Sequence, residues 1–345
     1  LPGWREYDQL EQFLYDLKGC PLDGMIIADP GVLILAKKLL PEVPVHISTQ
    51  AGAVSHADCT FWQSLGATRV VLARELSFED IRAIRQRISG ELELEVFIHG
   101  SMCVSFSGRC LLSENLVGRN ANNGCCAQPC RWNFELYEIA EEKRPESRFP
   151  VMETDRGTFI LSSKDLCMIE HIPELMEAGI ASFKIEGRMK SAYYAAVTAN
   201  AYRMAMDSYR KDPGGYRYDP LWGRELCSVS HRDYCTGYFL EAPDHNAQLT
   251  EKTGYIREKA YLAVATGYDA ETGRARFIQR NKVTAGMPVE LLSPGRCGVP
   301  FVARDLCDEE GKTVDCAPHP FMKFSMSVPF PVHPGDILRG GEPAV

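Results

Sequence analysis

Five cysteines, Cys103, Cys110, Cys125, Cys126 and Cys130, lie within 28 residues of this sequence. A uniform spread of all 13 cysteines over 345 residues would place about one of them in such a window. Thiols gathered in this way can hold a metal ion or an iron–sulfur cluster, whereas scattered reduced cysteines usually pack as small apolar groups. We therefore expect metal or redox chemistry in this segment.

The spacing of the cysteines favours an iron–sulfur cluster over zinc. Structural zinc usually takes two pairs of cysteines, each with about two to four residues between its members, and Cys126 with Cys130 is one such pair. An iron–sulfur cluster takes four thiolates and tolerates wider spacings. We expect Cys103, Cys110, Cys126 and Cys167 to hold a 4Fe–4S cluster, with Cys130 as the alternative fourth ligand. Zinc is the alternative metal.

Polar and charged side chains follow several short apolar runs. In the last of these runs Lys184, Glu186 and Arg188 alternate on one face of an expected strand, and Phe183 and Ile185 occupy the other face. In βα barrels the residues at the carboxyl ends of the strands line the active site. The sequence therefore predicts a polar site there, built from Gln50, Arg74, Glu75, His99, Lys184, Glu186 and Arg188.

These residues are expected to be held by repeated βα units. Apolar runs recur at 24–28, 43–47, 69–73 and 92–98, and helical patterns lie between them at 31–40 and 78–85. Ser77 is the expected N-cap of the second helix. A fifth unit combines a helix at 172–178 with a strand at 181–188. Such units predict an α/β fold with a parallel sheet. A TIM-like barrel needs about eight units, so we expect a βα barrel that lacks its N-terminal units.

The composition changes along the chain and predicts three segments. Residues 1–210 are expected to form the partial barrel, with a cysteine-rich insertion at about 100–168. Residues 211–249, which contain Pro213, Gly214 and Gly215, read as a linker and packing segment. Short apolar runs with Gly and Pro punctuation predict a small β-barrel domain over 250–345.

The charge and hydropathy of the sequence bear on whether the protein binds nucleic acid or a membrane. The net charge of −8 does not favour a polyanion over the whole surface, although a local basic patch would suffice for one RNA loop. Candidate phosphate contacts are Arg119, Lys190, Arg257, Lys259, Arg280 and Lys282. The sequence has no apolar window long enough to span a bilayer, and its first residues do not read as a signal peptide. We expect a cytoplasmic protein with no membrane partner.

The segment from Glu95 to Ser113, with two cysteines and two glycines at set spacing, closely resembles the signature of the collagenase-like peptidase family U-32. Further stretches are similar to the same family, namely 28–31, 48–50, 72–77, 128–132, 184–188 and 231–238. The resemblance spans nearly the whole chain. It is greatest to the branch that forms 5-hydroxyuridine in tRNA.

This resemblance implies an oxygen-independent hydroxylase that carries a 4Fe–4S cluster and modifies the wobble uridine of tRNA. It also implies prephenate, a dicarboxylate, as co-substrate, and leaves room for a homologous partner subunit. We expect Arg74, Lys184 or Arg188 to bind the carboxylates, and Glu75 or Glu186 to act as a base or to hold an arginine. The catalytic set is Glu75, His99, Lys184, Glu186 and Arg188, and the substrate-binding set is Gln50, Arg74, Arg131 and Trp132.

Alternative functions stay open at this point. Other members of the family are described as collagen-degrading peptidases, and the best nucleophile for such a reaction is Cys103 beside His99. The sequence contains neither an H-E-x-x-H zinc motif nor a G-x-S-x-G motif. For a hydroxylase, the uridine is expected to stack on Trp132 or Tyr193. A third possibility is an RNA-binding or partner subunit without catalysis.

Overall fold

The structure is a computed structural model that describes residues 2–340 with internal gaps. The residues left out of the description are 1, 104, 108–109, 111, 120–124, 132–138, 142–143, 150–151, 155–156, 160–162, 241–255, 257 and 341–345. The chain forms two compact units. Unit 1 contains Leu1–Glu186 and Asp233–Gly254, and unit 2 contains Gly187–Arg232 and Tyr255–Val345.

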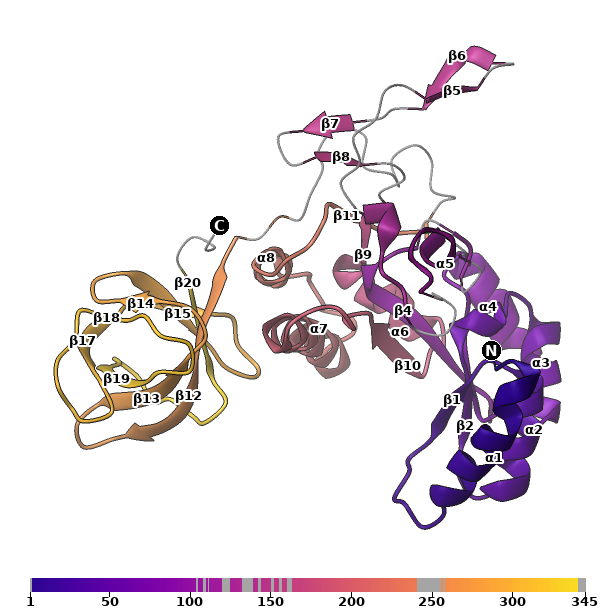
Figure 1. Cartoon of the computed structure of the whole chain (residues 1–345), viewed down its shortest axis with the longest axis horizontal. Helices are drawn as coiled ribbons and strands as arrows, with labels where there is room; N and C mark the ends of the chain where they lie inside the picture. The colour runs from indigo at the N-terminus through magenta and orange to yellow at the C-terminus, as the bar shows by residue number, and fades with distance from the viewer. Residues whose placement is uncertain are drawn as a thin grey trace. The chain divides into compact units, whose positions relative to one another are not determined.

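Unit 1 is built on a mixed sheet with a parallel part. The parallel strands are β1 (Met25–Ile27), β2 (Val45–Ile47), β3 (Arg69–Val71), β4 (Glu93–Ser101) and β10 (Ser182–Ile185). They pair in the order β1-β2-β3-β4, and β10 also pairs with β4. In Figure 1 the helices α1 to α4 lie together on one side of strands β1, β2 and β4.

Polar side chains cap the starts of several helices of unit 1. Asp29 accepts a hydrogen bond from the Val32 N–H, 3.0 Å away, at the start of α2. Ser77 and Asp80 form a reciprocal capping box at the start of α4, so the N-cap expected at Ser77 is confirmed. The helices are η1 (Trp4–Glu6), α1 (Tyr7–Asp16), α2 (Pro30–Leu39), η2 (Thr49–Ala51), α3 (His56–Ser64), α4 (Phe78–Arg87), α5 (Leu112–Val117), η4 (Pro129–Arg131), η5 (Ile169–His171) and α6 (Ile172–Glu177).

The two faces of the parallel strands differ in polarity. Val45, Ile47 and Val70 are fully buried, as is expected for the face that the helices cover. His46 and Arg69 alternate with these residues, are neighbours in the strand register, and are only half-buried. The sheet therefore presents polar side chains on the face away from its apolar core.

Two further strands join the unit-1 sheet, and four short strands after β4 form two small separate sheets. Strand β9 (Asp165–Cys167) pairs antiparallel with the end of β4, and β11 (Tyr234–Cys235) pairs with β9. Two small sheets are formed by β5 (Ile139–Glu141) with β6 (Arg144–Phe149) and by β7 (Met152–Thr154) with β8 (Gly157–Phe159).

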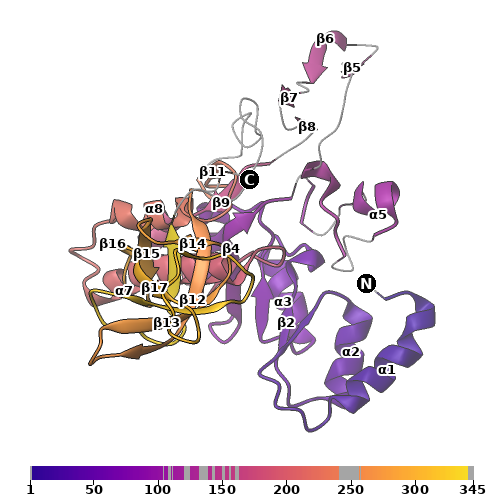
Figure 2. The same ribbon diagram turned by 60° about the vertical axis from the view of Figure 1, so that its left-hand side comes forward.

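Unit 2 contains two helices and an antiparallel β domain. The helices are α7 (Ala192–Lys211) and α8 (Pro220–Cys227), and the strands are β12 (Ala260–Asp269), β13 (Arg274–Gln279), β14 (Val283–Thr284), β15 (Pro288–Leu292), β16 (Val299–Val302), β17 (Arg304–Cys307), β18 (Cys316–Ala317), β19 (Lys323–Ser327) and β20 (Ile337–Gly340). Seven strands pair in the order β16-β15-β20-β12-β13-β19-β17, and the sheet curls around an apolar core that includes Leu262, Phe277 and Met326 (Figure 2).

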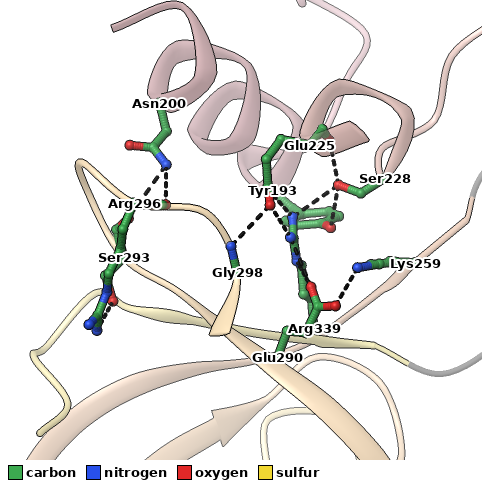
Figure 3. A network of polar contacts seen from close by, with 10 residues as sticks. All are labelled: Tyr193, Asn200, Glu225, Ser228, Lys259, Glu290, Ser293, Arg296, Gly298 and Arg339. Atoms are coloured by element: carbon green, nitrogen blue, oxygen red, sulfur yellow. Dashed lines mark hydrogen bonds and ion pairs between the residues drawn. The ribbon is translucent and has the colours of Figure 1, made fainter. Parts of the chain in front are cut away.

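A buried ion-pair network joins α8 to the β domain (Figure 3). Arg339 on β20 donates to Glu225 of α8 at 2.7 Å, to Ser228 Oγ at 3.0 Å and to Glu290 of β15 at 3.0 Å. Lys259 Nζ also contacts Glu290, at 2.5 Å. These contacts hold α8 against the β domain within unit 2.

The coarse fold expected from the sequence is confirmed: a mixed α/β part is followed by an antiparallel β domain. The predicted length of one strand is wrong. The strand predicted over 181–188 ends at Ile185, because its pairing with β4 shifts after Lys184 and a turn closes when the Lys190 N–H donates to Gly187 O. Glu186 and Arg188 therefore do not continue a strand face. In the part of the chain that the structure describes, no helix combines the length and apolar character needed to cross a bilayer.

Candidate functional site

The polar centre of unit 1 is the carboxylate of Glu95 on β4. Ser182 and Lys184 on β10 lie beside Glu95 and Phe97 in the strand register, so their side chains share one face of the sheet. Glu95 Oε1 accepts from Lys184 Nζ at 2.8 Å, and Oε2 accepts from Ser182 Oγ at 2.8 Å and from Arg69 Nη1 at 3.1 Å. One buried carboxylate therefore holds cations from both neighbouring strands.

Electrostatics keep this carboxylate ionised. Burial alone would raise the pKa of Glu95, but the hydrogen bond and charge of Lys184, together with Ser182 and Arg69, bring the pKa below its ordinary value. His46 lies beside Arg69 on the same face, and its pKa is lowered first by burial and then by the charge of Arg69. The face therefore favours Glu95 as an anion and His46 as a neutral ring near neutral pH.

Two cations lie close to the ring of Phe97. The Arg74 guanidinium carbon is 4.0 Å from the ring centroid, and Lys184 Nζ is 5.5 Å from it. Arg74 Nη1 donates to Ser101 O at 3.0 Å and lies 4.0 Å from Cys103 Sγ. Arg74 Nε is buried and has no hydrogen-bond partner among the described residues. The Nε–H of such a guanidinium can donate a hydrogen bond to one more anionic oxygen.

Glu75 stabilises the segment that follows β4. Its Oε1 accepts from the Ser107 backbone N–H at 2.8 Å, and its Oε2 accepts from Ser107 Oγ at 2.9 Å. The backbone N–H of Arg74 also donates to Ser107 Oγ, at 3.3 Å. Both carboxylate oxygens of Glu75 are thus occupied in positioning this segment, which places Cys103 near Arg74.

His99 and Glu186 come together at the end of β4. The Glu186 backbone N–H donates to His99 O at 2.9 Å, and Gly100 allows this approach because any Cβ at Gly100 would collide with Glu186 O. Gly100 also has φ +105°, which favours glycine. His99 is buried, its ring centroid lies 5.2 Å from that of Tyr234, and it neighbours Cys167 in the antiparallel register.

The thiols expected to bind iron differ in their exposure. Cys103 is exposed, whereas Cys110, Cys126, Cys130 and Cys167 are half-buried. Cys126 Sγ accepts from the Gln128 N–H at 3.3 Å. No group of three His, Cys, Asp or Glu side chains that could hold a metal ion is found within the described residues. Thiolates are the usual ligands of iron–sulfur clusters, so the 4Fe–4S cluster stays a prediction.

The contacts described above do not involve four of the other expected site residues. Gln50 lies in η2, where its backbone N–H donates to Ser48 Oγ at 3.2 Å. Arg188 is exposed and belongs to unit 2. Trp132 and the side chain of Arg131 lie outside what the structure describes.

Tyr193 is not available to stack on a uridine. Its ring is buried in unit 2 and stacks on Tyr261, with 5.5 Å between the ring centroids. Its hydroxyl lies 3.3 Å from Ser228 Oγ. Tyr193 therefore belongs to the core of its unit.

Three residues of the site were not anticipated from the sequence: Arg69, Glu95 and Phe97. A signal was present, because Glu91, Glu93 and Glu95 alternate with apolar residues and mark a polar face on an otherwise buried strand. Which of these carboxylates would meet Lys184 depends on the pairing of β4 with β10. That register is not visible in the sequence.

Two protein-family models match this sequence. Residues 2–249 match the model of peptidase family U32, and residues 257–339 match the model of the peptidase family U32 C-terminal domain. The chain belongs to peptidase family U32. The resemblance noted in the sequence is confirmed, and the two U32 matches fall on the α/β part and the antiparallel β domain.

U32 relatives carry two kinds of name. The tRNA hydroxylation protein P1 of Bacillus subtilis strain 168 is 34% identical over 335 residues, which cover 97% of this chain and 78% of the relative. The tRNA hydroxylation protein P of Escherichia coli K12 is 33% identical over 353 residues, 90% of this chain and 76% of the relative. A collagenase of Porphyromonas gingivalis W83 is 29% identical over 286 residues, 79% of this chain and 66% of the relative.

Proposed function

We propose that this chain hydroxylates tRNA, forming 5-hydroxyuridine at the wobble position in a reaction that depends on iron–sulfur and prephenate. The observation that carries the proposal is the 34% identity with tRNA hydroxylation protein P1 along 97% of the chain. Two further relatives with 32–33% identity bear the same kind of name. Such a role would place the protein in the cytoplasm, with tRNA as its macromolecular partner and a homologous subunit as a further candidate.

The geometry around Phe97 supports a small dicarboxylate as co-substrate. Arg74 offers a buried Nε without a partner in the described part of the chain, and Lys184 lies near the same ring. A guanidinium and an ammonium near one ring can each bind a carboxylate through charge-assisted hydrogen bonds. In this proposal Arg74 and Lys184 bind the two carboxylates of prephenate.

The neighbouring acidic residues take positioning roles in this reaction. Glu95 orients Lys184 through the 2.8 Å ion pair, and Glu75 keeps Ser107 and the following segment in place. We propose His99 and Glu186 as the groups that hold or move a proton, since a backbone hydrogen bond from the Glu186 N–H to His99 O joins them at the carboxyl end of β4. Gln50, Arg131, Trp132 and Arg188 remain proposed substrate contacts.

Two finer features belong to the same proposal. The iron–sulfur dependence is supported by the donor type and clustering of Cys103, Cys110, Cys126 and Cys167 in the sequence, with Cys130 as the alternative fourth ligand. The parallel strands β1 to β4 and β10, with their covering helices, are proposed as part of a TIM-like βα barrel.

The test is nucleoside mass spectrometry of tRNA from cells that lack the gene and its homologues. Complementation with the wild-type gene should restore 5-hydroxyuridine and its derivatives, whereas Cys110→Ser and Arg74→Gln should not. Exposed Arg304 provides a matched control, because Arg304→Gln changes charge equally and lies in the β domain. Unchanged 5-hydroxyuridine after deletion would reject the proposed reaction.

A peptidase activity is the second candidate. The supporting observation is that the exposed Cys103 sulfur, a candidate nucleophile, lies 4.0 Å from Arg74 Nη1, a donor that could stabilise negative charge on a substrate. The relative named collagenase has the same family assignment. Gelatin cleavage that is lost in Cys103→Ser and kept in Cys20→Ser would support this candidate, and no cleavage by the wild-type protein would reject it.

A further inference from the structure

An exposed turn of the β domain holds a phenylalanine in a conformation that favours glycine. The turn spans His319, Pro320, Phe321 and Met322, and the Met322 N–H donates to His319 O at 3.0 Å. Phe321 has φ +62°, at the third position of the turn, where a positive φ normally selects Gly or Asn. Its side chain is 66% exposed. Both the backbone and the ring are therefore in unfavourable settings.

The surrounding strands keep the turn in this conformation. The Phe321 N–H donates to Gln279 O at 3.2 Å, and the Gln279 N–H donates to Met322 O at 2.9 Å. The turn is thus joined to the end of β13 on both sides of Phe321. A strained residue that is held in place and presents an aromatic ring to solvent is a common feature of binding sites.

The guanidinium of Arg280 lies over the Phe321 ring. The guanidinium carbon of Arg280 lies 4.8 Å from the centroid of the Phe321 ring, although the two residues are far apart in the sequence. Arg280 and Lys282 are exposed and form no ion pair within the described residues. Lys259, by contrast, is engaged by Glu290.

Two other expected phosphate contacts each donate a hydrogen bond to a backbone carbonyl. Lys190 Nζ donates to Ser230 O at 2.7 Å, and Arg119 Nε donates to Cys125 O at 3.0 Å. Arg257 lies outside the described residues. Of the basic residues considered from the sequence, Arg280 is exposed and lies beside an aromatic ring, and Lys282 is exposed two residues further along the chain.

We propose that Phe321, Arg280 and Lys282 form a nucleobase-stacking site for single-stranded RNA on the β domain. An unpaired base stacks on the exposed face of the ring, and the two cations contact the adjacent phosphates. An aromatic ring with neighbouring cations matches this ligand, because RNA offers both a flat base and a negative backbone. The site binds RNA whatever its source, and its identification with tRNA rests on the proposed function.

The decisive variant is Phe321→Gly in the full chain. Glycine adopts a positive φ without strain, so the thermal unfolding midpoint should equal or exceed that of the wild type. Loss of the ring should nevertheless weaken binding of a fluorescein-labelled oligouridine, measured by anisotropy, by about 5- to 100-fold. Phe321→Trp should retain binding, and the introduced indole should be quenched when RNA is added.

Two further variants define the site. Arg280→Gln should lower the slope of log affinity against log salt by about one, because one phosphate contact is lost. Trp4→Ala is the matched control: Trp4 is also exposed beside an arginine, Arg5, at 5.1 Å, and its removal should leave RNA binding unchanged. Equal affinity of the wild type and Phe321→Gly for oligouridine and for unmodified tRNA would overturn the stacking site.

The outcome is separable from that of the proposed reaction. If Phe321→Gly loses RNA binding while gene deletion leaves tRNA 5-hydroxyuridine unchanged, the stacking site stands and the reaction falls. If deletion abolishes 5-hydroxyuridine but Phe321→Gly binds RNA and restores the modification fully, the reaction stands and the stacking site falls.

Discussion

The two units each contain a buried ion-pair cluster, and the clusters differ in how far their charges reach solvent. In unit 2, Arg339 is 1% exposed, and each of its three nitrogens donates to a partner within 3.0 Å. In unit 1, Glu95 is 6% exposed, but its partners Lys184 and Arg69 keep 30% and 24% of their side chains exposed. The first cluster is closed at its central guanidinium, although its outer carboxylate and ammonium side chains are 22% and 30% exposed, whereas in the second the cations themselves are partly exposed and can meet a ligand.

The pKa directions agree with this difference. Burial alone would lower the pKa of Arg339, but Glu225, Tyr193 and Glu290 raise it above the ordinary value, so the guanidinium stays charged inside unit 2. Burial would likewise raise the pKa of Glu290, but Lys259 and Arg339 lower it. A closed cluster of this kind can stabilise one arrangement of α8 and β20. An open cluster leaves charge available for binding.

The largest change is expected for Arg339→Met. Removing the guanidinium leaves the buried carboxylate of Glu225 without its main partner, which should cost about 3–5 kcal/mol of unfolding free energy. Urea unfolding would measure the loss, and hydrogen exchange would locate it in α8 and β20. Arg304→Met, at an exposed position, is the control. If exchange in α8 and β20 were as slow as in the wild type, the cluster would not be holding them together.

A smaller and pH-dependent loss is expected for Glu95→Gln. The variant leaves Lys184 and Arg69 without their shared carboxylate, and because both are partly exposed we expect a loss of about 2 kcal/mol at pH 7. Since the pKa of Glu95 is lowered in the folded state, this stabilisation is complete above its ordinary value of 4.5 and is lost as the pH falls through the lowered value.

The measurement for Glu95 compares unfolding free energies of the wild type and the variant from pH 7 into acid. The difference should shrink below pH 4.5. Glu93→Gln, on the same strand but exposed, is the control and should show a smaller difference at every pH. A difference that stayed constant with pH would argue against an ionised Glu95.

Arg74→Lys tests whether the open cluster binds a carboxylate. A lysine keeps the charge but not the paired donors of a guanidinium, so the KM for prephenate in tRNA hydroxylation should rise about tenfold. The urea midpoint should change little, because Arg74 is not the centre of a closed network. Arg82→Lys, at an exposed arginine over Phe78 in α4, is the control. An unchanged KM would remove Arg74 from the binding site.

The smallest effect is expected for Arg203→Ala. Arg203 pairs with Asp207 one turn along α7, and about half of each side chain is exposed. Exposed pairs of this kind contribute little, because solvent screens them. The urea midpoint should therefore equal that of the wild type. A clear loss would mean that burial is not what separates the strong ion pairs from the weak ones.

Much of the fold could be predicted from local patterns. The apolar runs placed β1 to β4 within a few residues of their observed bounds, and Ser77 marked the start of α4. The extent of β10 could not be read in this way, because Lys184, Glu186 and Arg188 alternate as in a strand, yet pairing with β4 shifts after Lys184. Strand β9, which pairs antiparallel with the end of β4, also lacked a distinct local signal.

The sequence by itself determined the family, the positions of the first four strands and the clustering of the cysteines. Tertiary structure alone decided that Glu95 meets Lys184 and Arg69, that Arg74 lies over Phe97, and that Arg280 lies over Phe321. The physical reason is the separation along the sequence over which each kind of interaction acts. Caps and hydrophobic periodicity act over a few residues and are written in the local sequence. Strand register and turn geometry are set by packing between segments that are far apart in the chain.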